Sequence, residues 1–363
     1  MKKRYSVFFI FLTISLLFSA CATTESSARV TPIETSISAI DKYGNSPLAI
    51  SEEAFWATSL EAGDIVSINI GSAKVEAPVC TNYSDVENGK VLVRVNGDVV
   101  SLSINMGNFA KTYNAEVGTP VVISLAKKAG YLKEYQVRQL TKSENRNDYV
   151  SDEVFANFRA VKAGKIASNR LYRCCNPLYG DARAPYAEKL IKQAAIKTAI
   201  NLADSDEGAR SHFKEAPYYA SIAANGNAVF LNMGVSFTDT DFITKLHDGL
   251  VFLSEHPEGP YVVHCNEGKD RAGFVNALLA ALNGATMDEM IADYMLSFEN
   301  YFGVKKGTEQ YTLIGQTIPD MFKTINGNKV VTDKNLAKVA ENYVLNTVKI
   351  TKDQLEAIRK NLQ

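Results

Sequence analysis

The segment GPYVVHCNEGKDRAGFVNALLAALNG, residues 259–284, constrains the fold of this chain more than any other. It begins with an apolar run of strand length and passes through a polar loop that contains a glycine. It then continues as an apolar run of helical length that ends at Asn283-Gly284. In layered α/β proteins, ligands bind beyond the carboxyl ends of buried parallel strands that lead into helices. The segment therefore predicts an α/β layer with a site at this strand end.

The sequence from residue 150 to residue 363 continues the alternation of strands and helices. This alternation predicts an α/β domain with a parallel central sheet flanked by helices. The predicted strands are 197–203, 228–234 and 259–265, and the predicted helices include 184–196 and 241–256. In the helical tail, the pairs that match the capping-box pattern are Thr286 with Glu289 and Thr351 with Gln354.

Residues 51–145 follow a different pattern, in which Val- and Ile-rich stretches alternate between apolar and polar positions. Such stretches, separated by Gly and Asn, predict a small all-β barrel or sandwich. The predicted strands are 64–70, 90–104 with a hairpin turn at Asn96-Gly97, 119–126 and, as a further candidate, 134–140. No catalytic cluster is evident in this half, so a binding or docking module is expected. The polar residues 141–153 are the predicted linker.

The N-terminus has the features of an export signal. Three basic residues precede an apolar run at 7–18, which is followed by Ser19, Ala20 and Cys21. This ending resembles the lipobox of bacterial lipoproteins, although a plain cleaved signal with an incidental cysteine is the alternative. We expect a signal peptide at 1–20, acylation of Cys21 and a polar tether at 21–50. The expected location is the bacterial cell envelope, lipid-anchored on the periplasmic or outer surface.

Composition excludes several classes of protein. The 363 residues include 39 basic and 40 acidic ones, a balance that argues against nucleic-acid binding. The hydrophobic content of 46% is that of an ordinary globular protein. Beyond Cys21, four cysteines are too few for a disulfide scaffold in a chain of this size. The four histidines lack metal-ligand spacing, so neither a metal nor an organic cofactor is expected.

Cys265 and Arg271 combine a nucleophile with an anion-binding group. A helix N-terminus carries unpaired N–H groups and partial positive charge, so it attracts both a phosphate and a thiolate. In such settings the pKa of a thiol falls from about 8.5 to between roughly 3.5 and 7.5. The planar guanidinium of an arginine can hold two phosphoryl oxygens. The five intervening residues are enough to surround the others, with Gly268 permitting a tight curve.

The segment HCNEGKDRAG resembles the His-Cys-x5-Arg signature of the cysteine-dependent protein tyrosine phosphatase superfamily. A second segment, NFRAVKAGKIASNRLYRCCNP at 157–177, resembles the opening of its bacterial branch of tyrosine/serine (dual-specificity) and phosphoinositide phosphatases. The resemblance covers residues of about 155–300. It implies that Cys265 attacks phosphorus to form a cysteinyl-phosphate, which water then hydrolyses, while Arg271 binds the equatorial oxygens. The implied partner is a phosphorylated protein or a phosphoinositide.

The resemblance also assigns roles around the loop. His264 would orient the loop and the thiolate, with a satisfied core histidine as the alternative. Lys269 would add positive charge for a multiply phosphorylated or lipid headgroup, or else be a solvated lysine. The implied substrate-binding residues are His264, Asn266, Glu267, Gly268, Lys269, Ala272 and Gly273.

The proton donor for the leaving group stays open between two locations. Asp270, inside the loop, is the choice that the resemblance to the bacterial branch favours. Many members of the superfamily instead use an aspartate upstream of the cysteine, where Asp239 and Asp241 lie in this sequence. Asp241 could equally cap the helix that it precedes.

Two departures from the family pattern suggest alternatives. Ala272 replaces the Ser or Thr that often follows the arginine, so turnover could be slow, and a pseudophosphatase that only binds phosphorylated ligands is a second hypothesis. A third places the main function in the β-rich half. Cys174 and Cys175 would lie near the site, where one of them could form a protective disulfide with Cys265. Two small buried residues in place of serines are the alternative, and non-reducing peptide mapping after mild peroxide distinguishes the two.

Overall fold

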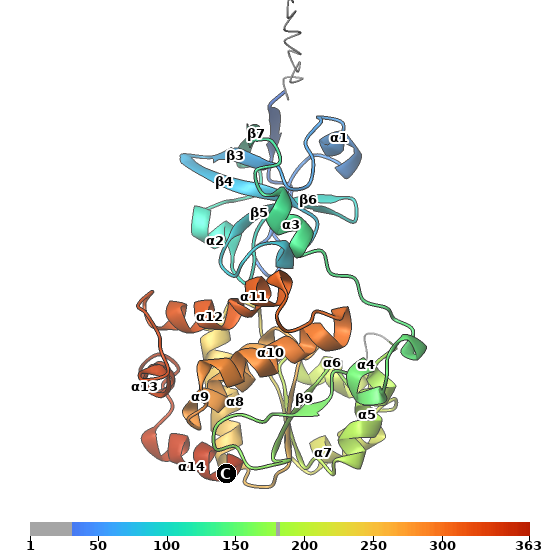
Figure 1. The fold of residues 1–363 in the computed structure, drawn as a ribbon, viewed down its shortest axis with the longest axis vertical. Coiled ribbons are helices and arrows are strands. Elements are labelled where there is room, and N and C mark those ends of the chain that lie inside the picture. The colour runs from blue at the N-terminus through green and yellow to red at the C-terminus, as the bar shows by residue number, and fades with distance from the viewer. Residues whose placement is uncertain (1–30, 179–181) are drawn as a thin grey trace, which may run out of the picture.

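The computed structural model describes residues 31–178 and 182–363. They form two parts, which lie one above the other in Figure 1: a β unit, residues 31–140, and an α/β unit, residues 152–363. The predicted signal peptide and Cys21 lie outside the described residues. Within the described ranges, no helix has the length and apolar character needed to cross a membrane.

The β unit is built on a curled, mixed sheet of seven strands in the order β1-β7-β3-β4-β5-β6-β2. Neighbouring strands are antiparallel except β4 and β5. The sheet curls until its two edges meet at a bridge between Ile37 and Leu48. The strands are β1 (Ile33–Ser36), β2 (Ser46–Pro47), β3 (Ile65–Ile70), β4 (Ala73–Cys80), β5 (Val91–Asn96), β6 (Val99–Ile104) and β7 (Pro120–Lys127). The short helices are α1 (Glu52–Trp56), η1 (Tyr83–Asp85), α2 (Phe109–Tyr113) and α3 (Leu132–Val137).

Three details of the sequence interpretation are wrong in this unit. The predicted tether at 21–50 ends by residue 33, because β1 and β2 are part of the sheet. The candidate strand at 134–140 is helix α3 instead. The hairpin turn has its two positive φ angles at Gly97 and Asp98, one residue later than expected. The period-two pattern itself is observed, since alternate side chains of β3 (Val66, Ile68 and Ile70) are buried.

The α/β unit contains a five-stranded sheet in the order β11-β10-β12-β9-β8. The first four strands are parallel, as expected, and the edge strand β8 is antiparallel to β9. Parallel pairing aligns the carboxyl ends, so that His264 lies opposite Asn201 on one side and Cys174 on the other. The strands are β8 (Arg159–Ala160), β9 (Leu171–Cys174), β10 (Thr198–Asn201), β11 (Ala228–Phe230) and β12 (Tyr261–His264).

Helices cover the sheet and extend beyond it. The first are α4 (Asp152–Phe155), α5 (Ala184–Gln193), α6 (Asp206–Ser211), α7 (Pro217–Ala224) and α8 (Thr240–Glu255). They are followed by α9 (Arg271–Leu282), α10 (Met287–Phe302), α11 (Glu309–Gly315), α12 (Thr317–Ile325), α13 (Leu336–Asn342), the π-helical η3 (Tyr343–Thr347) and α14 (Lys352–Leu362). Both predicted capping boxes are present, at the starts of α10 and α14.

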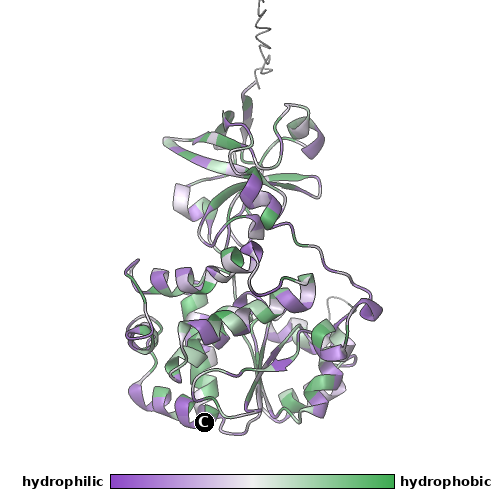
Figure 2. Cartoon of the chain, viewed as in Figure 1, coloured by the Kyte–Doolittle hydropathy of each residue, from purple (hydrophilic) through white to green (hydrophobic). Residues whose placement is uncertain are grey.

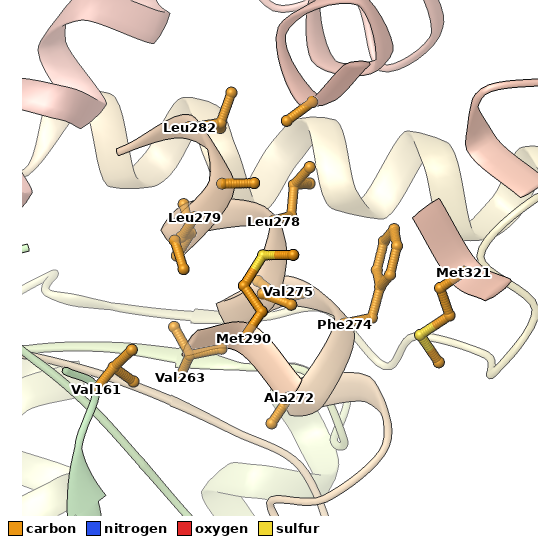
Figure 3. Packing of buried hydrophobic residues seen from close by; sticks show 14 of the residues in the cluster. Val161, Val263, Ala272, Phe274, Val275, Leu278, Leu279, Leu282, Met290 and Met321 are labelled. Carbon is orange, nitrogen blue, oxygen red and sulfur yellow. The ribbon is translucent and has the colours of Figure 1, made fainter. Parts of the chain in front are cut away.

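Helix α9 is the centre of the α/β core. All twelve of its residues are buried, and in Figure 3 Phe274 and Leu278 lie among side chains from several elements, including Met290 and Met321. Figure 2 shows hydrophobic residues concentrated on the strands and inner helices, with hydrophilic residues on the peripheral helices. A helix buried on every side has little freedom to shift, so the position of its N-terminal residue, Arg271, is well defined.

The two units touch around α11 and the start of α8. Lys133 of the β unit pairs with Glu309 at 3.0 Å, and Gln310 donates a hydrogen bond of 2.5 Å to the carbonyl of Val137. Met106 and Leu140 pack against the core of the α/β unit. The predicted linker is a segment with little regular structure, residues 141–151, that includes the short helix η2 (Arg146–Asp148).

Candidate active site

The loop of residues 265–270 joins the end of β12 to the start of α9. Cys265 is the first residue after the strand and is 3% exposed. Arg271 is the first residue of the helix. The strand and the helix are both buried, so the two side chains are fixed at the base of one short loop, as the sequence predicts.

Contacts from outside the loop hold four of its successive carbonyl groups. Asn176 N donates to Asn266 O at 2.9 Å. Asn157 Nδ2 and Tyr301 Oη donate to Glu267 O at 3.0 and 2.8 Å. Arg173 Nη2 donates to Gly268 O at 2.7 Å and to Lys269 O at 3.0 Å. The C=O and N–H groups of a trans peptide point in opposite directions, so the amides of residues 267–270 face the inside of the loop. None of these amides donates to another group of the described residues. Converging free amides form an anion-binding cradle.

A buried ion network anchors the arginine that holds this loop. Arg173, which is fully buried, contacts Asp293 at 2.6 Å, and Arg159 contacts the other carboxylate oxygen at 3.1 Å. Burial alone would raise the pKa of Asp293, but Arg159 and Arg173 outweigh it and the pKa is lowered. Arg159 and Arg173 are the arginines of the Asn-Phe-Arg and Leu-Tyr-Arg segments. The two segments therefore act by positioning the cradle.

We predict that Arg173→Met lowers both stability and activity. The change leaves two loop carbonyls without their donor and removes one counter-charge of buried Asp293, a loss worth about 3–5 kcal/mol. Arg173→Lys should recover part of the stability but little activity, because an ammonium lacks the planar fork that spans both carbonyls. Thermal unfolding and kcat/KM for phosphate release check this. Arg170→Met, which removes an arginine bonded to Asn361 O instead, should leave kcat/KM unchanged.

Gly268 lies at the tightest point of the loop. Its φ angle is +66°, and a Cβ atom there would be 2.1 Å from the carbonyl oxygen of Cys174. The loop thus approaches the end of β9 more closely than any residue with a side chain permits.

Arg271 is held by the backbone of two neighbouring strand ends. Its Nη1 donates to the carbonyls of Leu202 at 3.1 Å and Met233 at 3.0 Å. These contacts use one nitrogen of the guanidinium and set the plane of the whole group. Arg271 also lines a cavity, so the rest of its fork is available to a ligand.

A cavity of about 580 Å³ lies over the loop, between the two units. The loop residues in its lining are Asn266, Glu267, Lys269, Asp270 and Arg271. His264, Cys265, Gly268, Ala272 and Gly273 are not part of the lining. The β unit contributes its other side, with Tyr83 and Arg94 among the residues there. This volume is within the range of small-molecule sites.

Charged side chains along the loop form a chain of contacts. Glu267 contacts Lys142 at 2.5 Å and Lys269 at 3.0 Å. Burial opposes ionisation of Glu267, but these two cations lower its pKa to about 2. Burial likewise disfavours the charge of Lys269, whereas Asp270 and Glu267 raise its pKa overall. Lys269 is largely buried, so the alternative of a solvated lysine is wrong.

The comparison with protein families agrees with this geometry. Residues 155–363, more than half of the chain, match the model of the family described as "Tyrosine phosphatase family". The chain belongs to the tyrosine phosphatase family. Residues 35–122, in the β unit, match a second model, described as "SAM hydroxide adenosyltransferase C-terminal domain". A comparison with curated proteins found no match.

Solved structures show more distant similarities to this phosphatase. The core catalytic domain of the PP-IP phosphatase SIW14 from S. cerevisiae, in complex with citrate, is 16% identical over 47% of this chain and 91% of its own, with a TM-score of 0.28. An uncharacterized conserved protein from Thermotoga maritima is 21% identical over 26% of this chain, with a TM-score of 0.24. The match spans 36% of the Thermotoga chain. At these TM-scores neither similarity establishes a common fold.

His264 of the phosphatase signature is fully buried and neutral at pH 7. Its Nε2 is 2.7 Å from Tyr219 Oη. Burial is the main reason that its pKa falls to about 4. The residue therefore cannot stabilise the thiolate with a positive charge. Its Nδ1 is buried without a hydrogen-bond partner in the described structure, so the alternative of a satisfied core histidine is wrong. Orientation of the loop by His264 stays a prediction.

The candidate proton donors of the phosphatase lie in different cavities. Asp270 lines the large cavity, and burial raises its pKa despite the opposing charge of Lys269. Asp239 and Asp241 line a separate pocket of about 200 Å³ at the start of α8. Asp239 is the N-cap residue there, so the expectation that Asp241 caps this helix is wrong by two positions. Only Asp270 is placed beside Arg271.

Cys174 and Cys175 lie at the end of β9, next to the loop. Neither is in a disulfide in the described part of the chain, nor is Cys265. Burial is the main cause of a strongly raised pKa of Cys174. Cys175 is as deeply buried, at 1% exposed. The protective disulfide with Cys265 stays a prediction for both cysteines.

Proposed function

We propose that this protein hydrolyses phosphomonoesters of phosphotyrosine or phosphoserine proteins, or of phosphoinositides, through a cysteinyl-phosphate. The single observation that carries the proposal is the inward-facing set of amides at residues 267–270, bounded by Cys265 and Arg271. Such amides bind the non-bridging oxygens of a phosphoryl group while a thiolate attacks phosphorus from below.

The placement of the loop residues supports the following reaction. The Sγ–P bond forms as the bond from phosphorus to the leaving oxygen breaks, and that oxygen takes a proton from Asp270. Arg271 and the amides bind the three equatorial oxygens, whose charge is spread in the transition state. A water molecule then attacks phosphorus and gives a proton to the Asp270 carboxylate, the Sγ–P bond breaks, and inorganic phosphate and the thiolate are released. Ala272 has no hydroxyl to assist this second step.

The test is release of inorganic phosphate by the reduced full-length protein. The substrates are p-nitrophenyl phosphate, phosphotyrosine and phosphoserine peptides, and soluble phosphoinositides, and Cys265→Ser is the matched inactive protein. Turnover of at least one phosphoester, with a ranking among the classes, would support the proposal. Absence of turnover together with retained ligand binding would refute it in favour of a phosphate-recognition protein, with Ala272→Ser as the first reversion to examine.

We predict that Asp270→Asn lowers kcat by about 100-fold for phenyl phosphate, whose leaving group needs a proton, and far less for p-nitrophenyl phosphate. A donor must be protonated, so wild-type kcat for phenyl phosphate should fall as pH rises through the raised pKa of Asp270. The variant should lose this dependence. Steady-state kinetics as a function of pH checks both. A larger loss in Asp239→Asn or Asp241→Asn would move the role to the α8 pocket.

A further inference from the structure

We propose that the β unit supplies a second anion-binding site, so that the preferred substrate is a small molecule carrying another phosphate beside the one removed. The inference rests on the proposed function and specifies its substrate. The donors of this second site, which we call the β-side donors, are Asn88, Arg94 and Arg138. All three line the same cavity as the catalytic loop.

Arg138 is the first observation. It follows α3 directly and is 3% exposed, yet its Nε and Nη2 have no hydrogen-bond partner in the described structure. Its contact with a carboxylate is a long one, at 3.8 Å from Glu87. Leaving a buried guanidinium without acceptors is costly, so such a group in a cavity wall indicates a ligand that supplies them.

Arg94 and Asn88 are the second observation. Arg94, on β5, stacks over the ring of Tyr83 at 4.9 Å and has no carboxylate at ion-pair distance among the described residues. The Nδ2 of Asn88 is buried without a hydrogen-bond partner in the same part of the chain. Three donors from separate positions of the β unit therefore line one space, and two of them have buried N–H groups without acceptors.

The acidic residues of the cavity do not neutralise these donors. Asp41 accepts hydrogen bonds from Tyr43 N and Asn45 Nδ2, both at 2.8 Å, within its own turn. Glu267 is held by two lysines, and Asp270 is 3.8 Å from Lys269. Among the described residues, Glu87 is the one carboxylate at ion-pair distance from these donors, so the two arginines outnumber their acidic partners and favour an anion.

The size of the cavity decides what kind of anion fits. About 580 Å³ holds a small molecule, with one phosphate in the amide cradle and a second group at the β-side donors. A soluble polyol bisphosphate and a phosphoinositide headgroup share this chemistry, since the headgroup carries a phosphodiester and a phosphomonoester. Guanidinium groups recognise either second phosphate with charge-assisted hydrogen bonds.

Calorimetric titration of the full-length Cys265→Ser protein tests the inference without relying on turnover. The probes are inositol 1-phosphate and inositol 1,4-bisphosphate. We expect the bisphosphate to bind roughly tenfold more tightly, the effect of one or two charge-assisted hydrogen bonds. Adding Arg94→Gln should remove most of this preference and leave the monophosphate affinity unchanged. Arg210→Gln, which alters an exposed arginine paired with Asp206, is the matched control.

A further probe identifies the source of the second phosphate, and a second variant repeats the test in case one variant does not fold. A short-chain, soluble phosphatidylinositol 4-phosphate that binds as tightly as the bisphosphate would support a lipid headgroup, and a weaker affinity would support a soluble substrate. Arg138→Gln, checked by circular dichroism, repeats the test at the buried arginine. Equal affinities for the mono- and bisphosphate, or a preference that survives Arg94→Gln, would overturn the inference. If the bisphosphate is preferred but the wild-type protein hydrolyses no phosphoester, only the proposed function is refuted.

Discussion

Phosphate release by Cys265→Ser is expected to fall to the background rate, a loss of about 10⁴-fold or more in kcat. A thiolate is the attacking group in the proposed reaction, and an alcohol ionises far less readily than a thiol. Serine would therefore need a neighbouring base. His264 is a weak base, because burial lowers its pKa to about 4.

The measurement is kcat with p-nitrophenyl phosphate, since a good leaving group isolates the nucleophile from the proton donor. Cys80→Ser makes the same chemical change at a fully buried thiol of the β unit, and it should retain wild-type kcat. Rapid mixing with the wild type should also trap a phosphorylated enzyme that Cys265→Ser does not form. Activity that persisted in Cys265→Ser would mean that another group attacks phosphorus.

Gly268→Ala should reduce kcat/KM by at least about 100-fold, because displacement of catalytic groups by about 1 Å has an effect of this size. The added Cβ would be 2.1 Å from the carbonyl oxygen of Cys174, which belongs to a core strand and cannot move aside cheaply. The loop must therefore shift, and the amides of residues 267–270 shift with it. Left-handed backbone adds about 1–2 kcal/mol of strain for any residue with a side chain.

Gly226→Ala separates these two effects. Gly226 also has a positive φ, +76°, but a Cβ there meets nothing within 4 Å. This variant should lose a similar amount of stability from backbone strain and keep its kcat/KM. Equal activity losses in both variants would show that general destabilisation, rather than the collapse of the cradle, causes the effect.

The parts of the site that the sequence predicts are those encoded locally. Cys265 and Arg271 are six positions apart, and the strand, loop and helix that carry them are consecutive in the sequence, so a local pattern predicts that they lie close together. The order of β10, β12 and the intervening helices follows from the same short-range patterns. Arg159 and Arg173 are recognisable as parts of family segments. Only the structure shows that Arg173 holds two loop carbonyls and that Arg159 shares Asp293 with it.

The remaining parts depend on long-range contacts that leave no local pattern. Asp293 is one of several acidic residues on α10, and nothing in its surroundings marks it as the partner of two buried arginines. Arg94 and Arg138 become lining residues only when the β unit docks on α11. The strand assignment at 134–140 failed for a related reason, because a short apolar alternation fits a helix equally well.

The contacts that hold the loop also determine when a newly made chain can act. Arg173 comes long before the nucleophile in the sequence and Asp293 comes after it, so the cradle is assembled from both directions. A chain that is still unfolded carries Cys265 and Arg271 but no oriented amides around them. The loop therefore cannot take its final shape until α10 has been synthesised and packed.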